Sequence, residues 1–215
     1  MKKIISMAVA AVLMVSALSA LELEFGARGI LGRNLDKGSF KDNVAQAKED
    51  KTFDAGFGVY GMFALFGNLG IQAEANYVKS SMNFNVKDEN GKTQKKEYEI
   101  HTLDLAPMVW LNLPLGKLAI GLGAGPNFSI PVAQIGDVKN AKKDDFKMGV
   151  IGGADFKFYF TDHLGLVLSG RYVAEWEKRN ATITAYGQEV ETPLPEYSFN
   201  RKTIYGGVGL EFKLL

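Results

Sequence analysis

The sequence predicts an all-β fold, an eight-stranded antiparallel up-and-down β-barrel. Apolar residues recur with a period of two in eight segments, and no window carries the i, i+3, i+4 spacing of an amphipathic helix of useful length. Short links alternate with long polar ones between these segments. With 215 residues, 47% of them hydrophobic and 23% charged, the chain has the composition of one folded domain.

The first residues predict a secretory signal peptide. Lys2 and Lys3 precede an apolar run from Ile4 to Val15, and small residues then supply a cleavage site after Ser19 or Ala20. This run is too short to cross a bilayer as a helix. We therefore expect a signal peptide over residues 1–20 and a barrel domain over residues 21–215.

Of the first four alternating segments, the one that opens the series alternates less cleanly than the others. In chain order, their apolar faces carry Leu21, Leu23, Phe25 and Ala27; Phe53, Ala55, Phe57, Val59, Gly61, Phe63 and Leu65; Leu69, Ile71, Ala73, Ala75 and Tyr77; and Leu103, Leu105, Pro107, Val109 and Leu111. Polar residues fill the opposite face, most clearly in the third segment, where Gln72, Glu74 and Asn76 alternate with the apolar set. Each segment therefore reads as a strand with two unlike faces.

The last four segments alternate over a greater length. Their apolar faces carry Leu118, Ile120, Leu122, Ala124, Pro126, Phe128 and Ile130; Met148, Val150, Gly152, Ala154, Phe156, Phe158 and Phe160; Leu164, Leu166, Leu168, Gly170, Tyr172, Ala174 and Trp176; and Ile204, Gly206, Val208, Leu210, Phe212 and Leu214. The fifth segment alternates these with glycine and small polar residues, and the sixth and seventh alternate them with charges.

The links between segments fall into two classes. Residues 66–68, 112–116 and 161–163 have hairpin length and contain Gly, Pro, Asn or Asp, the residues that tight turns favour. The other links are long and polar: residues 33–51, 87–96, 131–145 and 177–202. Because the two classes alternate along the chain, all four long links lie at one end of the barrel.

Alternation alone does not say which face is outside. A soluble lipocalin-type barrel turns its apolar face inward, whereas a transmembrane β-barrel turns it to lipid. Strand length, the asymmetry of the links and a polar face of glycine and charge favour the transmembrane barrel. Aromatic residues also gather near both ends of the strands: Phe63, Phe158, Phe160 and Phe212 near the short links, and Phe53, Tyr77, Phe128, Tyr172 and Trp176 near the long ones.

The charged residues of the strands then belong to the lumen. Asp155 is expected to lie opposite Ser169 and diagonal to Arg171, within reach of an ion pair. An ionised side chain on the lipid face would cost about 2–4 kcal/mol for a base at mid-bilayer. We expect a lumen charge network of Glu74, Asp104, Asp155, Lys157, Arg171, Glu175, Glu211 and Lys213.

Two stretches, residues 103–128 and 149–172, resemble the family of eight-stranded bacterial outer-membrane β-barrels, which includes the OmpX-like and OmpA-transmembrane-like barrels of the porin group. The resemblance is carried by Pro107, Gly123, Gly125, Gly153, Arg171 and Tyr172. It implies a location in the outer membrane, contact with outer-membrane lipid, and recognition by the insertion machinery during biogenesis. Many members end in an aromatic residue, whereas this chain ends in Leu215, so recognition of the last strand would rest on Tyr205, Leu210, Phe212 and Leu214.

No catalytic, cofactor-binding or metal site is expected. Cysteine is absent, and His101 near Ser80 and Ser81 is the only arrangement that resembles a hydrolase pair, with nothing to orient it. Without Lys2 and Lys3 the chain holds 23 basic against 24 acidic residues, which argues against a nucleic-acid partner.

These features predict a structural or surface-interaction protein. Eight strands leave an interior just wide enough for side chains to fill, and the four long external loops would contact an extracellular ligand or host factor. The alternatives are a narrow pore or conduit for small or hydrophobic solutes, a lipid-active enzyme and a soluble lipocalin-like binder.

Overall fold

The computed structural model describes residues 23–35, 39–40, 47–66, 68–87, 93–136, 146–182 and 196–214. The signal peptide over residues 1–20 lies outside these residues and stays a prediction. Among the described residues, no helix is long and apolar enough to cross a membrane.

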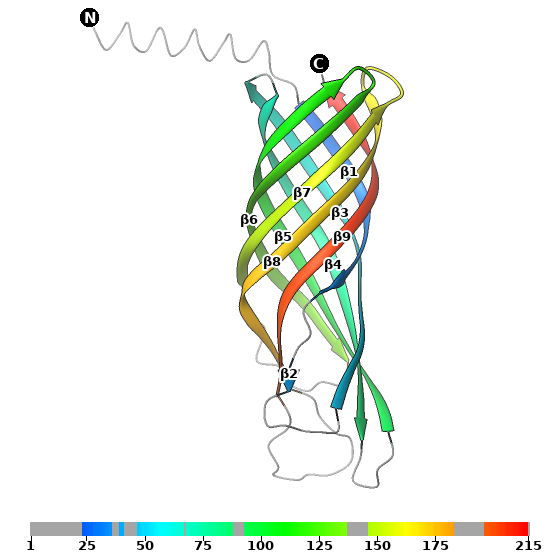
Figure 1. The fold of residues 1–215 in the computed structure, drawn as a ribbon, viewed down its shortest axis with the longest axis vertical. Helices are drawn as coiled ribbons and strands as arrows, with labels where there is room; N and C mark the ends of the chain where they lie inside the picture. The colour runs from blue at the N-terminus through cyan, green and yellow to red at the C-terminus, as the bar shows by residue number, and fades with distance from the viewer. Residues whose placement is uncertain are drawn as a thin grey trace, which may run out of the picture.

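The strands form one closed antiparallel barrel (Figure 1). The eight wall strands are β1 (Leu23–Asn34), β3 (Ala47–Phe66), β4 (Leu69–Lys87), β5 (Thr93–Leu115), β6 (Leu118–Gly136), β7 (Lys147–Tyr159), β8 (Leu164–Thr182) and β9 (Glu196–Leu214). Each pairs with the next, and β1 pairs with β9 to close the ring. The two-residue strand β2 (Ser39–Phe40) pairs with the end of β9 that lies opposite the short turns. The predicted all-β, eight-stranded up-and-down barrel is confirmed.

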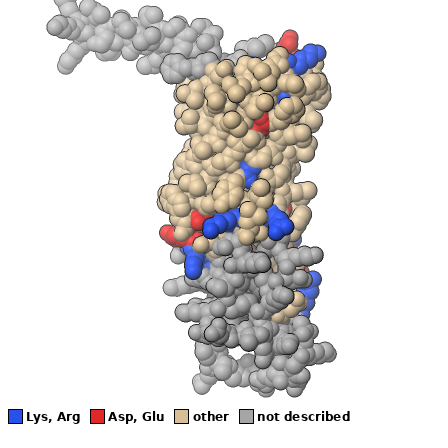
Figure 2. All heavy atoms as spheres, in the orientation of Figure 1, with Lys and Arg blue, Asp and Glu red and all other residues tan. Residues whose placement is uncertain are grey.

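The two faces of the wall alternate as the sequence predicts. In the β7–β8 hairpin, Phe156 and Leu168 are 45% and 47% exposed, whereas Asp155 is 1% exposed. Asp155 lies directly opposite Ser169, which confirms the predicted register. A slip of one residue would turn every charge of the hairpin outward. Figure 2 shows the result on one face of the molecule, a broad band of mostly uncharged surface with charged atoms gathered at its lower edge.

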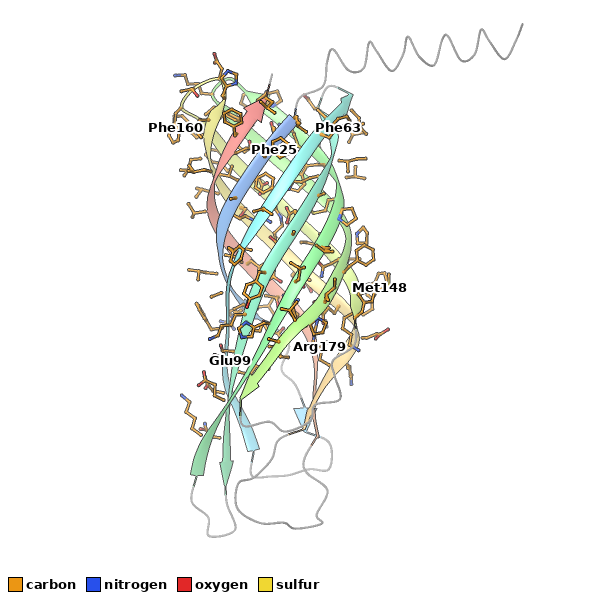
Figure 3. The ribbon with its side chains drawn as sticks, turned by 180° about the vertical axis from the view of Figure 1, so that it is seen from behind. Phe25, Phe63, Glu99, Met148, Phe160 and Arg179 are labelled. Atoms are coloured by element: carbon orange, nitrogen blue, oxygen red, sulfur yellow. The ribbon has the colours of Figure 1, made fainter. Side chains whose placement is uncertain are left out.

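The short turns all lie at the end of the barrel where the described chain begins and finishes (Figure 1). The turn between β5 and β6 is shorter than expected, since strand geometry continues to Leu115 and leaves only Gly116 and Lys117. Gly116 has a φ of 71°, a conformation that glycine adopts without a steric penalty. Phe63 and Phe160 also lie at this end, while Glu99 and Arg179 lie toward the other (Figure 3).

At the opposite end the strands run farther than predicted. The connections are therefore shorter than the links expected at 33–51, 87–96, 131–145 and 177–202. At this end, β3 begins at Ala47, β5 at Thr93 and β9 at Glu196, and β8 continues to Thr182. Beyond a lipid-facing band, an outward residue need not be apolar for the ladder to continue. The period-two hydrophobic signal therefore stops before the hydrogen-bonded strands do.

Trp110 explains why one wall of the lumen carries glycine. Its side chain is fully buried, and a Cβ at Gly121 or Gly123 would overlap the indole ring. The Gly-rich face of β6 thus leaves the space that Trp110 fills, as close packing of a narrow interior requires.

We predict that Gly123→Ala lowers the free energy of unfolding by about 1–3 kcal/mol, because the added methyl group displaces the Trp110 ring. Urea unfolding of the refolded protein in detergent micelles measures the change. Gly206→Ala is the matched control, since a Cβ there meets no atom within 4 Å. Equal stability of the two variants would contradict this account of the glycine face.

Candidate functional site: the charged lumen

The lumen is filled by inward-facing side chains of both kinds. Among the largest fully buried side chains are Trp110, Met62 and Met108, together with Arg179 and Lys157. The apolar members form a cluster with Ile30, Val78, Ala106, Ile151, Val173 and Tyr205. The lumen is thus less uniformly polar than the sequence suggested, because apolar side chains occupy the space around the ions.

The first group of ions lies toward the short-turn end. The Nζ of Lys157 lies 2.5 Å from Glu24 Oε2 and 2.8 Å from Glu211 Oε2. The Tyr60 hydroxyl donates to Glu211 at 2.8 Å, and the Tyr159 hydroxyl donates to Glu211 at 2.5 Å, with Glu24 Oε1 3.2 Å from the same hydroxyl oxygen. These residues come from β1, β3, β7 and β9. We call Glu24, Lys157 and Glu211 the inner ion cluster.

The second group lies at mid-height. Arg171 Nη1 lies 2.6 Å from Asp155 Oδ1, and its Nη2 lies 2.6 Å from Glu74 Oε1. Arg28, on β1, also pairs with Glu74, on β4. The Arg171 guanidinium lies 4.9 Å from the centre of the Trp110 ring, within range of a cation–π interaction. Arg28, Glu74, Asp155 and Arg171 form the middle ion cluster.

The third group lies toward the long-loop end. Arg201 binds Asp104 at 2.8 Å and Glu175 at 3.3 Å. Arg179 binds Glu175 at 2.6 Å. Both arginines also donate to the Ser129 hydroxyl, at 2.9 Å from Arg179 and 3.2 Å from Arg201. These two arginines and two acids form the outer ion cluster.

Burial makes the pairing within each cluster obligatory. The side chains of the paired ions are 0–4% exposed. Transfer of such groups out of water costs several kcal/mol for each ion, and mutual attraction offsets that cost only with good geometry. Removing one partner leaves an unpaired buried charge and is therefore strongly destabilising.

The eight predicted lumen residues do not all join one network. Glu74, Asp155 and Arg171 lie in the middle cluster, Lys157 and Glu211 in the inner cluster, and Asp104 and Glu175 in the outer cluster. Lys213 is half-buried near the short-turn mouth. Seven of the eight predicted residues thus lie in three ion clusters at different heights.

Sequence reasoning missed four of the buried paired ions, which fall into two groups. Arg179 and Arg201 fall in a segment that was expected to be an external link, and their alternation with Lys178 and Lys202 was the available signal. Glu24 and Arg28 share the inward parity of the first strand, and that parity was sufficient to place them. Their partners, Lys157 on β7 and Glu74 on β4, lie on strands that do not adjoin β1, and no local pattern encodes such contacts.

The only hydrolase-like pair in the sequence is not assembled. Ser80 is buried on the inner face, whereas His101 belongs to the outward set of β5, where its Nδ1 lies 2.6 Å from the Tyr77 hydroxyl oxygen. Ser81, on the outer face, donates to Glu99 at 3.3 Å and not to the histidine. Among the described residues, no group of three or more His, Cys, Asp or Glu side chains could hold a metal ion.

A family model described as "Outer membrane protein beta-barrel domain" matches residues 5–212. A comparison with curated proteins gives no match. The outer membrane protein OprG from Pseudomonas aeruginosa superposes with a TM-score of 0.72 at 14% identity, over 90% of this chain and 95% of that one. Ail of Yersinia pestis, in complex with the heparin analogue sucrose octasulfate, gives 0.46 at 10% identity, over 90% and 99%. Outer membrane protein W of E. coli gives 0.40 at 14% identity, over 85% and 96%. The likeness to OprG supports the fold alone, and no argument rests on the other two.

We predict that Arg171→Leu lowers the free energy of unfolding by about 3–5 kcal/mol, because it leaves Glu74 and Asp155 facing each other without their shared cation. The temperature at which the folded band loses its heat-modifiable gel shift should fall accordingly. Lys178→Leu is the control, since Lys178 is exposed on the same strand. If both variants melt like the parent protein, Arg171 does not hold the middle cluster together.

Proposed function

The chain belongs to the outer membrane protein β-barrel family, and from that premise we propose that it is a plugged barrel with a structural or surface-interaction role. It lies in the bacterial outer membrane. The observation that carries the proposal is the stack of three buried ion clusters, which crosses the lumen at three heights. With the lumen obstructed, the four external connections are the parts left to meet other molecules.

Those connections follow from the strand order. They join β1 to β3, β4 to β5, β6 to β7 and β8 to β9, and all four leave the barrel at the end opposite the short turns. An extracellular ligand or host factor would bind there. No catalytic activity is proposed, because Ser80 and His101 lie on opposite faces of the wall.

Two further partners fit the outer surface. Outer-membrane lipid would cover the apolar band, which includes Phe57, Val109 and Val208. The insertion machinery would read the outward residues of β9, Leu210, Phe212 and Leu214. Tyr205, expected to contribute to that signal, instead points into the lumen and accepts a hydrogen bond from Arg201 at 2.5 Å.

We predict that a membrane-impermeant maleimide labels Asp144→Cys, in the β6–β7 connection, in intact cells. Asp162→Cys, in the short β7–β8 turn, should be labelled only after the outer membrane is permeabilised. The absence of native cysteine removes background from both variants. Labelling of Asp162→Cys in intact cells would reverse the orientation, and with it the proposed role of the long connections.

A second candidate function, a narrow conduit for small or hydrophobic solutes, is favoured by two hollows. A cavity of about 620 Å³ opens at the short-turn end, lined in part by Met62, Tyr159 and Lys213, and reaches the inner ion cluster through Tyr159. A groove of about 780 Å³ lies along the wall beside Ala27, Gly61 and other small residues. Solutes would have to displace the ion clusters to pass from one end to the other.

We expect refolded protein in a planar bilayer to show no reproducible open steps, since each cluster must lose its pairing for ions to cross. A wide outer-membrane porin, recorded under the same conditions, is the positive control. Steady steps in the parent protein would contradict the plugged lumen and support the conduit, if the same steps are seen in Lys157→Met, which removes the cation of the inner cluster.

A further inference from the structure

Three exposed basic residues lie on adjacent strands at the external edge of the apolar band. Arg33 is near the end of β1, Lys202 is on β9 and Lys178 is on β8, and all three are exposed. Among the described residues none of them makes an ion pair. We call Arg33, Lys178 and Lys202 the external basic patch.

The strand register brings the three side chains within reach of one another. Arg33 pairs with Ile204, which is two residues from Lys202 on β9. Lys178 pairs with Asn200, two residues from Lys202 in the other direction. Lys202 is therefore the diagonal neighbour of both, at a distance of about 7–8 Å. Long basic side chains at that spacing can contact the same multiply charged group.

The tilt of the strands keeps the patch at a single depth. Barrel strands tilt by about 35–45°, so a diagonal step across neighbouring strands runs nearly parallel to the membrane plane. Figure 2 shows basic and acidic atoms at the lower edge of the uncharged band, on the face that β7, β8 and β9 occupy in Figure 1. The patch therefore forms a short horizontal belt.

Apolar and aromatic residues adjoin this belt on its membrane side. Trp176 is 63% exposed on β8, and Tyr172 and Ile204 form the neighbouring outward pair. Tryptophan and tyrosine side chains are favoured at the boundary between hydrocarbon and headgroups. The basic patch thus lies at the height of the lipid headgroups of the outer leaflet.

The local charge balance leaves the patch cationic. Glu177, the neighbour of Lys178 in the chain, is exposed and pairs with Lys147 at 3.2 Å. Arg179 and Arg201, the charged residues next in sequence, point inward and belong to the outer ion cluster. Among the residues that the structure describes, these three positive charges therefore face outward without a protein counter-charge, which makes a surface that attracts anions.

We propose that the external basic patch binds the phosphate groups of an outer-leaflet glycolipid, with its acyl chains against Trp176, Tyr172 and Ile204. Arginine and lysine are the side chains that recognise phosphate, arginine in bidentate geometry and lysine as a point charge. The bilayer holds the headgroup at this depth, so the ligand is a lipid and not a free anion. This inference is independent of whether the lumen is plugged.

The experiment titrates the refolded full-length barrel in detergent micelles with diphosphoryl lipid A and with dephosphorylated lipid A, and native mass spectrometry counts the bound lipid. We expect the phosphorylated form to bind more tightly. Lys202→Gln should weaken its binding about fivefold, and Arg33→Gln/Lys178→Gln/Lys202→Gln about a hundredfold, on the usual contribution of one basic residue near an anionic lipid. The heat-modifiable gel shift verifies that each variant is folded.

Lys117→Gln is the matched control, because Lys117 is an exposed lysine in the turn at the other end of the barrel. It should bind diphosphoryl lipid A as the parent does. Equal affinity for the two lipids, or unchanged affinity in the triple variant, would overturn the proposal. Inorganic pyrophosphate that binds the patch as tightly as the lipid would also overturn it, since the site would then recognise a free anion.

Discussion

An ionised side chain is costly in hydrocarbon, and this constraint organises the molecule. The strands carry many charges, and a wall one residue thick has only two sides on which to place them. With lipid outside, every strand charge within the apolar band must face the lumen, and there it must find a counter-ion because little water is available. The inward orientation of the Asp155 side chain and the register of the β7–β8 hairpin both follow from this requirement.

The same constraint explains how much could be predicted from sequence. Parity placed Glu74, Asp104, Asp155, Lys157, Arg171, Glu175 and Glu211 on the inner face, because alternation with outward apolar residues is a local property. The choice of partner was predicted only for Asp155 and Arg171, which are neighbours in one hairpin. The contacts of Lys157 with Glu24 and Glu211 join strands that are far apart in sequence, and they depend on the radius and closure of the barrel.

The ends of the strands were predicted less well, for a related reason. Past the lipid, selection for apolar outward residues disappears, so the polar run around Arg179 and Arg201 reads as a loop although both residues lie on paired strands. Their inward side chains complete the outer ion cluster. The sequence therefore did not reveal the part of the lumen nearest the long connections, because its residues lie in segments that were expected to be links. The proposed plug depends on this part of the lumen.

The position of β1 gives the inner ion cluster a role in assembly. Glu24 comes from this first strand and binds Lys157 on β7, on the other side of the seam where β1 meets β9. In an unsealed sheet, Lys157 would lack this partner and would keep Glu211 of β9. Closure of the seam therefore completes the inner ion cluster at the same moment as it supplies the last ladder of backbone hydrogen bonds. Electrostatics and main-chain pairing thus favour the same final step of biogenesis, and a partly opened barrel would forfeit both.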